Sequence, residues 1–152
     1  ERLPWNSFLV VKTGGQWTNH NLPSPEQFRL GGAYSVRGYP ESDSSGDYGY
    51  SFSTEVNMPV PLLPKEWKIA WTNKTWYESV RLVGFLDGGK TYLRERTVDE
   101  NVKDRFLLGT GFGVRVDLGR NFSLRFDLGF PIGDDSLDEN QKQVHITVTG
   151  GF

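Results

Sequence analysis

The stretch from Phe122 to Phe130 alternates strictly between apolar residues and polar or small ones. Its even-numbered positions are all phenylalanine or leucine, and Ser123, Arg125 and Asp127 stand between them. Successive side chains of a β-strand point to opposite faces, whereas apolar residues of an amphipathic helix recur every three or four positions. The pattern therefore predicts a strand with one apolar and one charged face. The fold must then place these two faces in different surroundings.

Five other stretches share this two-residue period, and no stretch carries a convincing helical pattern. The expected strands are Trp5–Trp17, Tyr50–Met58, Val80–Leu93, Phe106–Leu118, Phe122–Phe130 and Val144–Phe152. An aromatic content of 14% and 18 glycines favour short strands joined by turns and loops. The sequence thus predicts an all-β fold, an antiparallel meander of about six strands.

The connections between these strands alternate in length. Long connections follow the first, third and fifth strands, whereas residues 119–121 form a tight turn after the fourth. In an antiparallel meander this order gathers the long loops at one end, as in transmembrane β-barrels. Opposed charges on the polar face, such as Arg115 and Asp117, suit a water-filled lumen. Periodicity alone leaves an alternative open, a small soluble β-barrel or sandwich module that buries its apolar face.

The segment from residue 65 to 79 is unusually aromatic. It contains Trp67, Trp71, Trp76 and Tyr77. Such a cluster fits the aromatic belt at a membrane interface, and it fits a packed connection of a soluble domain equally well.

Composition and charge exclude several function classes. A net charge of −2 does not indicate the basic surface that nucleic-acid binding requires. The absence of cysteine excludes disulfides and thiolate metal sites. His20 and His145 are expected to be structural, so we expect neither a metal nor a cofactor. Glu55 and Asp87 are a possible acid/base pair, but no nucleophile, metal shell or phosphate-binding loop accompanies them. We therefore expect no enzyme. Because Glu1 is not an initiator residue, we expect the chain to be processed or part of something longer.

The connection from Leu22 to Tyr48 is far too long for a hairpin turn, yet it does not resemble a linker. Apolar and aromatic residues recur through its middle, and Arg37 is the single charge between Leu30 and Pro40. We expect this segment, called the long loop below, to fold against another part of the protein. A buried arginine there needs a carboxylate opposite it.

Several short motifs, in order along the chain, carry a family resemblance. In and beside the long loop they are Phe28–Gly32, Ser35–Tyr39, Ser45–Gly49 and Glu55. Together they resemble the signature loop of the BamA/TpsB superfamily, outer-membrane barrels that insert or export proteins. A second signature, Phe-x-Asp-x-Gly, matches at Phe85, Asp87 and Gly89. The residues of these motifs are most similar to those of the TpsB branch, the two-partner-secretion transporters of the haemolysin-activator (ShlB/FhaC/HecB) type.

The resemblance implies a fold and a set of site residues. Residues 1–152 would be the C-terminal segment of a transmembrane β-barrel, without the N-terminal strands and POTRA domains of the family. The long loop would fold into the barrel, where Arg37 meets Phe85, Asp87 and Glu55 in a loop lock. The loop motif would consist of Gly31, Gly32, Val36, Gly38 and Tyr39, and its glycines would permit positive φ or close contact with the barrel wall. Phe152 would be the aromatic C-terminal strand signal.

The resemblance also implies a function, passive export of an unfolded partner polypeptide across the bacterial outer membrane or an organelle outer envelope. Expected partners are this secreted polypeptide, outer-membrane lipid and the barrel-assembly machinery, with no nucleic acid. Six strands are too few to close around charged side chains, so the fragment is expected to stay open or to self-associate through its strand edges. A BamA-like assembly factor and the barrel of a patatin-like autotransporter are alternatives within the superfamily.

Overall fold

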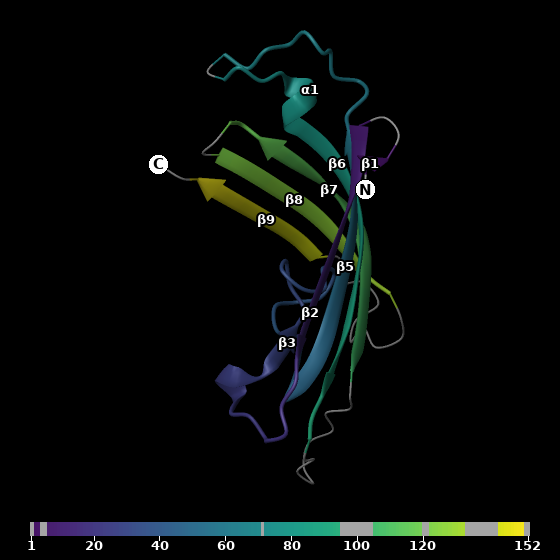
Figure 1. Ribbon diagram of the computed structural model, residues 1–152, viewed down its shortest axis with the longest axis vertical. Helices are drawn as coiled ribbons and strands as arrows, with labels where there is room; N and C mark the ends of the chain where they lie inside the picture. The colour runs from purple at the N-terminus through teal and green to yellow at the C-terminus, as the bar shows by residue number, and fades with distance from the viewer. Residues whose placement is uncertain are drawn as a thin grey trace.

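The computed structural model describes residues 2–3, 6–70, 72–94, 105–119, 122–132 and 143–150, which form one curved antiparallel sheet and a loop lying against it (Figure 1). The sheet has the order β1-β2-β5-β6-β7-β8-β9. Its strands are β1 (Arg2–Leu3), β2 (Ser7–Gln16), β5 (Tyr48–Pro59), β6 (Val80–Tyr92), β7 (Phe106–Asp117), β8 (Phe122–Pro131) and β9 (Gln143–Gly150). Each strand pairs antiparallel with the next one in this order. The predicted all-β meander is therefore confirmed.

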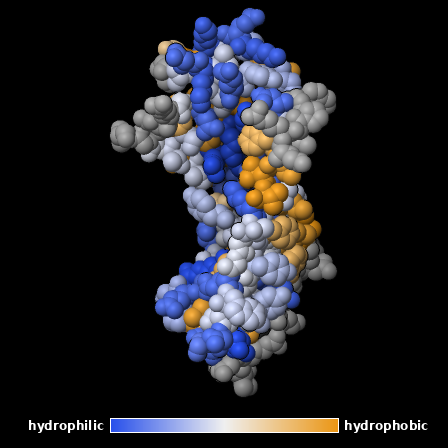
Figure 2. Space-filling view, in the orientation of Figure 1, coloured by the Kyte–Doolittle hydropathy of each residue, from blue (hydrophilic) through white to orange (hydrophobic). Residues whose placement is uncertain are grey.

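The register places side chains of one kind in rows across the sheet. One row joins Val56, Gly84, Phe112 and Leu128, each the cross-strand partner of the next. Most large apolar side chains of this face are exposed, among them Leu9, Val11, Met58, Leu82, Leu86, Phe112, Val144, Ile146 and Val148. Figure 2 shows apolar atoms gathered at mid-height along one flank, with hydrophilic atoms above them. We call this surface the apolar face.

The opposite face of the sheet is polar and lies on the concave side. A neighbouring row there contains Glu55 and Phe85, and the next contains Asp87 opposite Gly109. Asp127 belongs to the same face, because it reaches an arginine of the long loop, whereas Phe126 lies in register with Val114 on the apolar face. We call the concave surface of β5 to β8 the inner wall. Glu55, Asp87 and Asp127 thus share the face that meets the loop, whereas Phe126 lies on the opposite face.

The sheet is open. β1 and β9 stand at its two ends, and among the described residues no hydrogen-bonded pairing joins them. The expectation that this segment does not close by itself is therefore confirmed. Self-association through the free edges stays a prediction.

The long loop has more regular structure than the sequence indicated. It contains a 3-10 turn, η2 (Ser24–Glu26), and two three-residue strands, β3 (Phe28–Leu30) and β4 (Ser44–Gly46), which pair with each other. Strands this short show no detectable period in the sequence. Beyond them the tip of the loop folds over the inner wall (Figure 1).

The connection between β5 and β6 contains a short helix for which the sequence showed no pattern. α1 (Trp76–Ser79) is a single turn that begins at a capping box, in which the Thr75 hydroxyl accepts a hydrogen bond from the Glu78 N–H. Glu78 accepts the Thr75 N–H in return, and this hydrogen bond lowers the pKa of its carboxyl. No helix in the described part of the chain is long and apolar enough to cross a membrane.

Candidate functional site

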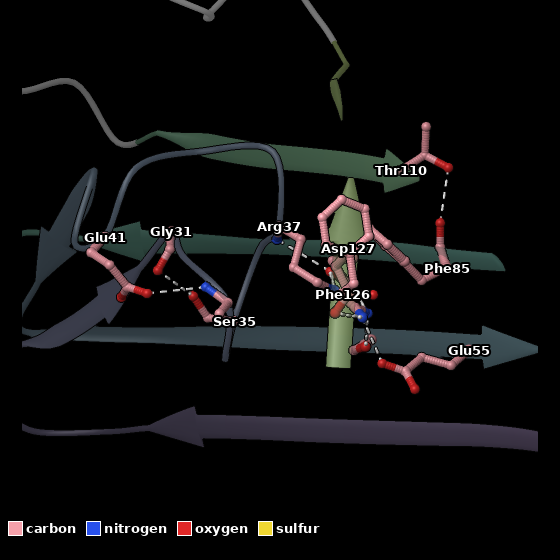
Figure 3. A network of polar contacts seen from close by, with 12 residues as sticks. Gly31, Ser35, Arg37, Glu41, Glu55, Phe85, Thr110, Phe126 and Asp127 are labelled. Atoms are coloured by element: carbon pink, nitrogen blue, oxygen red, sulfur yellow. Dashed lines mark hydrogen bonds and ion pairs between the residues drawn. The ribbon is translucent and has the colours of Figure 1, made fainter. Parts of the chain in front are cut away.

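Arg37 of the long loop reaches the inner wall and is almost fully buried there (Figure 3). Its Nε and Nη2 donate to the two carboxylate oxygens of Asp87 at 2.6 and 2.8 Å, a bidentate pair. Nη1 donates to Glu55 Oε1 at 2.7 Å, and Nη2 lies 3.3 Å from the Ser53 hydroxyl. The guanidinium carbon stands 3.6 Å from the centre of the Phe85 ring. The structure thus brings the four expected site residues together around one guanidinium.

Asp87 accepts hydrogen bonds from the backbone of the long loop as well as from the Arg37 side chain. It is fully buried on β6, and its Oδ2 accepts a hydrogen bond from the Arg37 N–H at 3.2 Å. Phe85, two residues earlier on the same face, is fixed in turn by a hydrogen bond from the Thr110 hydroxyl to its carbonyl oxygen. The wall side of the site is therefore built on paired strands and does not depend on another loop.

Tight turns of the loop tip present Arg37 to the wall. Gly31, Gly32 and Gly38 have φ of +105°, +94° and +105°, a region that side-chain-bearing residues rarely adopt. The Gly32 N–H donates to the Tyr39 carbonyl at 3.0 Å and so closes the tip. At Gly38 a Cβ would also come within 2.8 Å of the Phe130 carbonyl carbon. Glycine is required at this position for conformation and for space.

Apolar residues on both sides of Arg37 anchor the tip. Val36 is fully buried, and it forms a core cluster with Leu30, Tyr39 and Leu107 of β7. The Tyr39 hydroxyl also donates to the Ile132 carbonyl at 3.4 Å. This cluster lies between loop and wall, so the loop is part of the packed core of this segment.

Glycines of the inner wall leave room for the loop backbone, a role that the sequence did not reveal. A Cβ at Gly109 would overlap the Arg37 carbonyl oxygen, and one at Gly129 would overlap the Gly38 backbone nitrogen. Gly109, Gly111 and Gly113 alternate along one face of β7. A row of glycines on the polar face of a strand is a signal for close backbone approach.

Two further charged residues extend the site. Arg115 of β7 donates to Asp127 of β8 at 2.6 Å, and Asp127 Oδ2 also lies 3.6 Å from Arg37 Nη1. With Glu55 and Asp87, the cluster holds three carboxylates and two guanidinium groups. Burial alone lowers the pKa of Arg37, but its hydrogen bonds to Asp87 and the nearby carboxylate charges outweigh burial and raise it. Arg37 therefore remains a cation.

Asp47 fastens the base of the loop, and it was also missed as a site residue. Its two carboxylate oxygens accept the N–H groups of Leu22 and Arg94, each at 2.8 Å. Asp47 lies in the Ser45–Gly49 motif, which the sequence linked to the family without assigning it a contact. Its carboxylate ties the start of the loop and the end of β6 to the residue where the loop returns to the sheet.

The site offers ion pairs, hydrogen bonds and an aromatic face as binding contacts. A cavity of about 230 Å³ opens beside Arg37, lined in part by Lys12, Tyr34, Arg115 and Arg125. No group of three or more histidine, cysteine or acidic side chains in the described ranges is placed to hold a metal ion. Phe152, the expected strand signal, lies outside the described residues.

Comparison with known proteins agrees with this architecture. The family model of haemolysin secretion/activation proteins (ShlB/FhaC/HecB) matches residues 6–116. The heme/hemopexin transporter protein HuxB of Haemophilus influenzae (strain 86-028NP) is 23% identical over 141 residues, which cover 92% of this chain and 23% of HuxB. CdiB from Acinetobacter baumannii superimposes with a TM-score of 0.67 at 22% identity, over 95% of this chain and 23% of CdiB, which shows a shared fold. The chain thus spans less than a quarter of the length of either relative. By its match over most of its length, the chain belongs to the ShlB/FhaC/HecB family of haemolysin secretion/activation proteins.

Proposed function

We propose that this chain forms the C-terminal part of an outer-membrane transporter that passively exports an unfolded partner polypeptide. Family membership supports a transporter, and the two faces of the sheet support a barrel wall. The exposed apolar face suits contact with lipid, and the charged inner wall suits a hydrated passage. A soluble module would bury the apolar face, and the described structure leaves it bare.

The long loop acts in this proposal as a conformational lock on the passage. The observation that carries it is Arg37, a buried cation on a loop that is paired bidentately to Asp87 on the wall. Charged hydrogen bonds next to a polar cavity can be exchanged for water, so such a contact is firm and yet reversible. Moving the loop would expose the polar inner wall to a passing chain.

The remaining partners follow from the same proposal. Lipid of the bacterial outer membrane would cover the apolar face, and the barrel-assembly machinery would insert the finished barrel. Further strands, with POTRA domains before them, would complete the structure in the natural full-length protein. We propose no enzymatic activity, because the site provides only ion pairs, an aromatic face and hydrogen bonds.

Export is tested by deleting the gene of the full-length protein and following its partner polypeptide. The partner is expected to accumulate inside the cell and to reappear in the medium on complementation. The purified protein in liposomes should make an unfolded partner protease-protected without any nucleotide, and a partner kept folded by an engineered disulfide should stay accessible. Secretion that continues in the deletion strain would contradict the proposal. A general loss of outer-membrane proteins from that strain would instead indicate an assembly factor.

A further inference from the structure

A second arginine of the inner wall shares carboxylates with Arg37. Arg115 is 8% exposed on β7, and its Nη1 donates to Asp127 Oδ1 at 2.6 Å. Its Nη2 also lies 3.7 Å from Glu55 Oε1, the atom to which Arg37 donates at 2.7 Å. Arg115 belongs to a paired strand and cannot leave with the loop.

The sharing between the two arginines is reciprocal. Arg37 has its short contact with Glu55 and its long one, 3.6 Å, with Asp127, whereas Arg115 has the short contact with Asp127 and the long one with Glu55. Asp87 pairs with Arg37 alone among the ion pairs of the described residues. Two of the three wall carboxylates can therefore be held by either arginine.

We propose that Arg115 is a positioning residue that competes with Arg37 for Glu55 and Asp127 and so sets how readily the loop leaves the wall. The proposal rests on the loop lock described above and deepens it. When Arg37 departs, Arg115 takes over both shared carboxylates, and Asp87 alone loses its counter-ion. Without Arg115, departure would leave three carboxylates of the inner wall without a counter-ion.

The space around Arg115 permits this exchange. A Cβ at Gly113 would overlap Asp127 Oδ1 and come within 3.0 Å of Arg115 Nη1, so glycine at this position keeps the path between the two side chains clear. The cavity beside Arg37 is lined by both arginines, by Glu55 and by Asp127. Side chains along this cavity can turn from one partner to the other without disturbing the packed core.

The sign of the effect distinguishes competition from simple support. Arg115→Gln removes a rival for Glu55 and Asp127 and deprives the vacated wall of the guanidinium that pairs with both carboxylates, so the loop should open less often. If Arg115 merely supported the site, its loss should loosen the loop as the loss of Arg37 does.

The test uses Val36→Cys in the natural full-length protein, on a background without other cysteines. Val36 belongs to the loop tip and is fully buried between loop and wall, so a thiol reagent added to intact cells labels this position only when the loop opens. Tyr34→Cys, at a residue that is 85% exposed, controls for access of the reagent. Arg115→Gln should lower labelling at position 36 by about two- to tenfold, in the lower range for residues that share one charge network. Labelling at position 34 should not change.

Arg125→Gln is the matched control. Arg125 is the cross-strand partner of Arg115 and lines the same cavity, but it is exposed and makes no ion pair with any described residue. Removing its charge should leave labelling at position 36 near the wild-type value. Equal protection by both substitutions would show that total charge, and not competition for shared carboxylates, controls the loop.

Two more variants distinguish a failure of the competition between the arginines from a failure of the loop lock itself. Arg37→Ala must raise labelling at position 36, and if it does not, the lock itself is wrong. If Arg37→Ala opens the loop and Arg115→Gln opens it too, the lock stands and the competition is refuted. Should Arg115→Gln fail to assemble, Arg115→Lys provides the test. Its ammonium cannot bridge two carboxylates as a guanidinium does, so labelling should lie below the wild-type value. Labelling at or above wild type would overturn the proposal.

Discussion

Arg37 combines three kinds of contact at one position: a bidentate pair with Asp87, a charged hydrogen bond to Glu55 and stacking on Phe85. Only a guanidinium has the planar arrangement of donors that satisfies all three. Truncation of either partner of the pair leaves the other charged and partly desolvated. The adjoining cavity is polar, so the penalty should lie well below that of a deeply buried pair.

We predict that Arg37→Ala and Asp87→Ala each weaken loop docking by about 1–2 kcal/mol, the range of a charged hydrogen bond. Arg37→Lys should not restore docking, because an ammonium reproduces neither the bidentate pair nor the stacking. Protease sensitivity of the long loop in the full-length protein measures docking, and secretion should fall although the barrel still assembles. In a double-mutant cycle the two alanine effects should not add. Strictly additive effects would show that the pair carries no coupling.

The sequence indicated part of this site and not the rest. Arg37, Glu55, Phe85 and Asp87 were all identified through short motifs along the chain. Asp127 and Arg115 were not assigned, although their charges were noted. Which strand faces a loop depends on sheet curvature and cross-strand register, and neither follows from the period of a single strand.

At the scale of elements, the long loop is a folded part of the core. Its tip packs Val36 and Tyr39 against β7, and its backbone lies on wall positions where only glycine leaves room. Because the Arg37 carbonyl lies directly against Gly109, a substitution at this position tests the fit of loop and wall without removing any charge.

We predict that Gly109→Ala displaces the loop by steric overlap, at a cost of about 1–3 kcal/mol, as for overpacked cores. Labelling of Val36→Cys by a thiol reagent should rise. Gly84→Ala is the matched control, because a Cβ at Gly84 meets nothing within 4 Å. If both alanine variants leave the loop equally protected, the loop does not rest on the wall as described.

A separate prediction concerns the base of the loop. Asp47→Asn replaces one of two carboxylate acceptors by an N–H donor, so the Leu22 or the Arg94 N–H loses its partner. We expect a destabilisation of about 1 kcal/mol, the lower end of the cost of an unsatisfied donor, because both hydrogen bonds are only partly buried. Limited proteolysis should cut the loop faster, chiefly near η2. Asp117→Asn, at an exposed carboxylate, should leave the cleavage rate unchanged.

The sequence predicted the long secondary-structure elements well and missed short ones. The six long strands follow from alternation, and their ends lie within about two residues of the expected positions wherever the structure describes them. The β3–β4 pair and α1 were missed. Each spans four residues or fewer, so local turn chemistry and docking, and not periodicity, determine their structure.

At the scale of the whole molecule, the sheet has a polar inner wall and an apolar face, and each requires different surroundings. The loop covers part of the inner wall, whereas the apolar face is covered by nothing in the described structure. A water-soluble protein rarely exposes so continuous an apolar surface. Phe112, near the middle of β7 and 57% exposed, lies at the centre of this face.

We predict that Phe112→Arg impairs barrel assembly, because a charged residue on the lipid face near the membrane midplane costs about 2–4 kcal/mol. In the full-length protein, less of this variant should reach the outer membrane as a folded barrel, measured by the shift between heated and unheated samples on a gel. Tyr34→Arg, at an exposed residue of the loop, places the same charge away from lipid and should assemble normally. A soluble module makes the opposite prediction. There an arginine in place of an exposed phenylalanine would be tolerated and would improve solubility, so normal folding of Phe112→Arg without detergent would refute the membrane assignment.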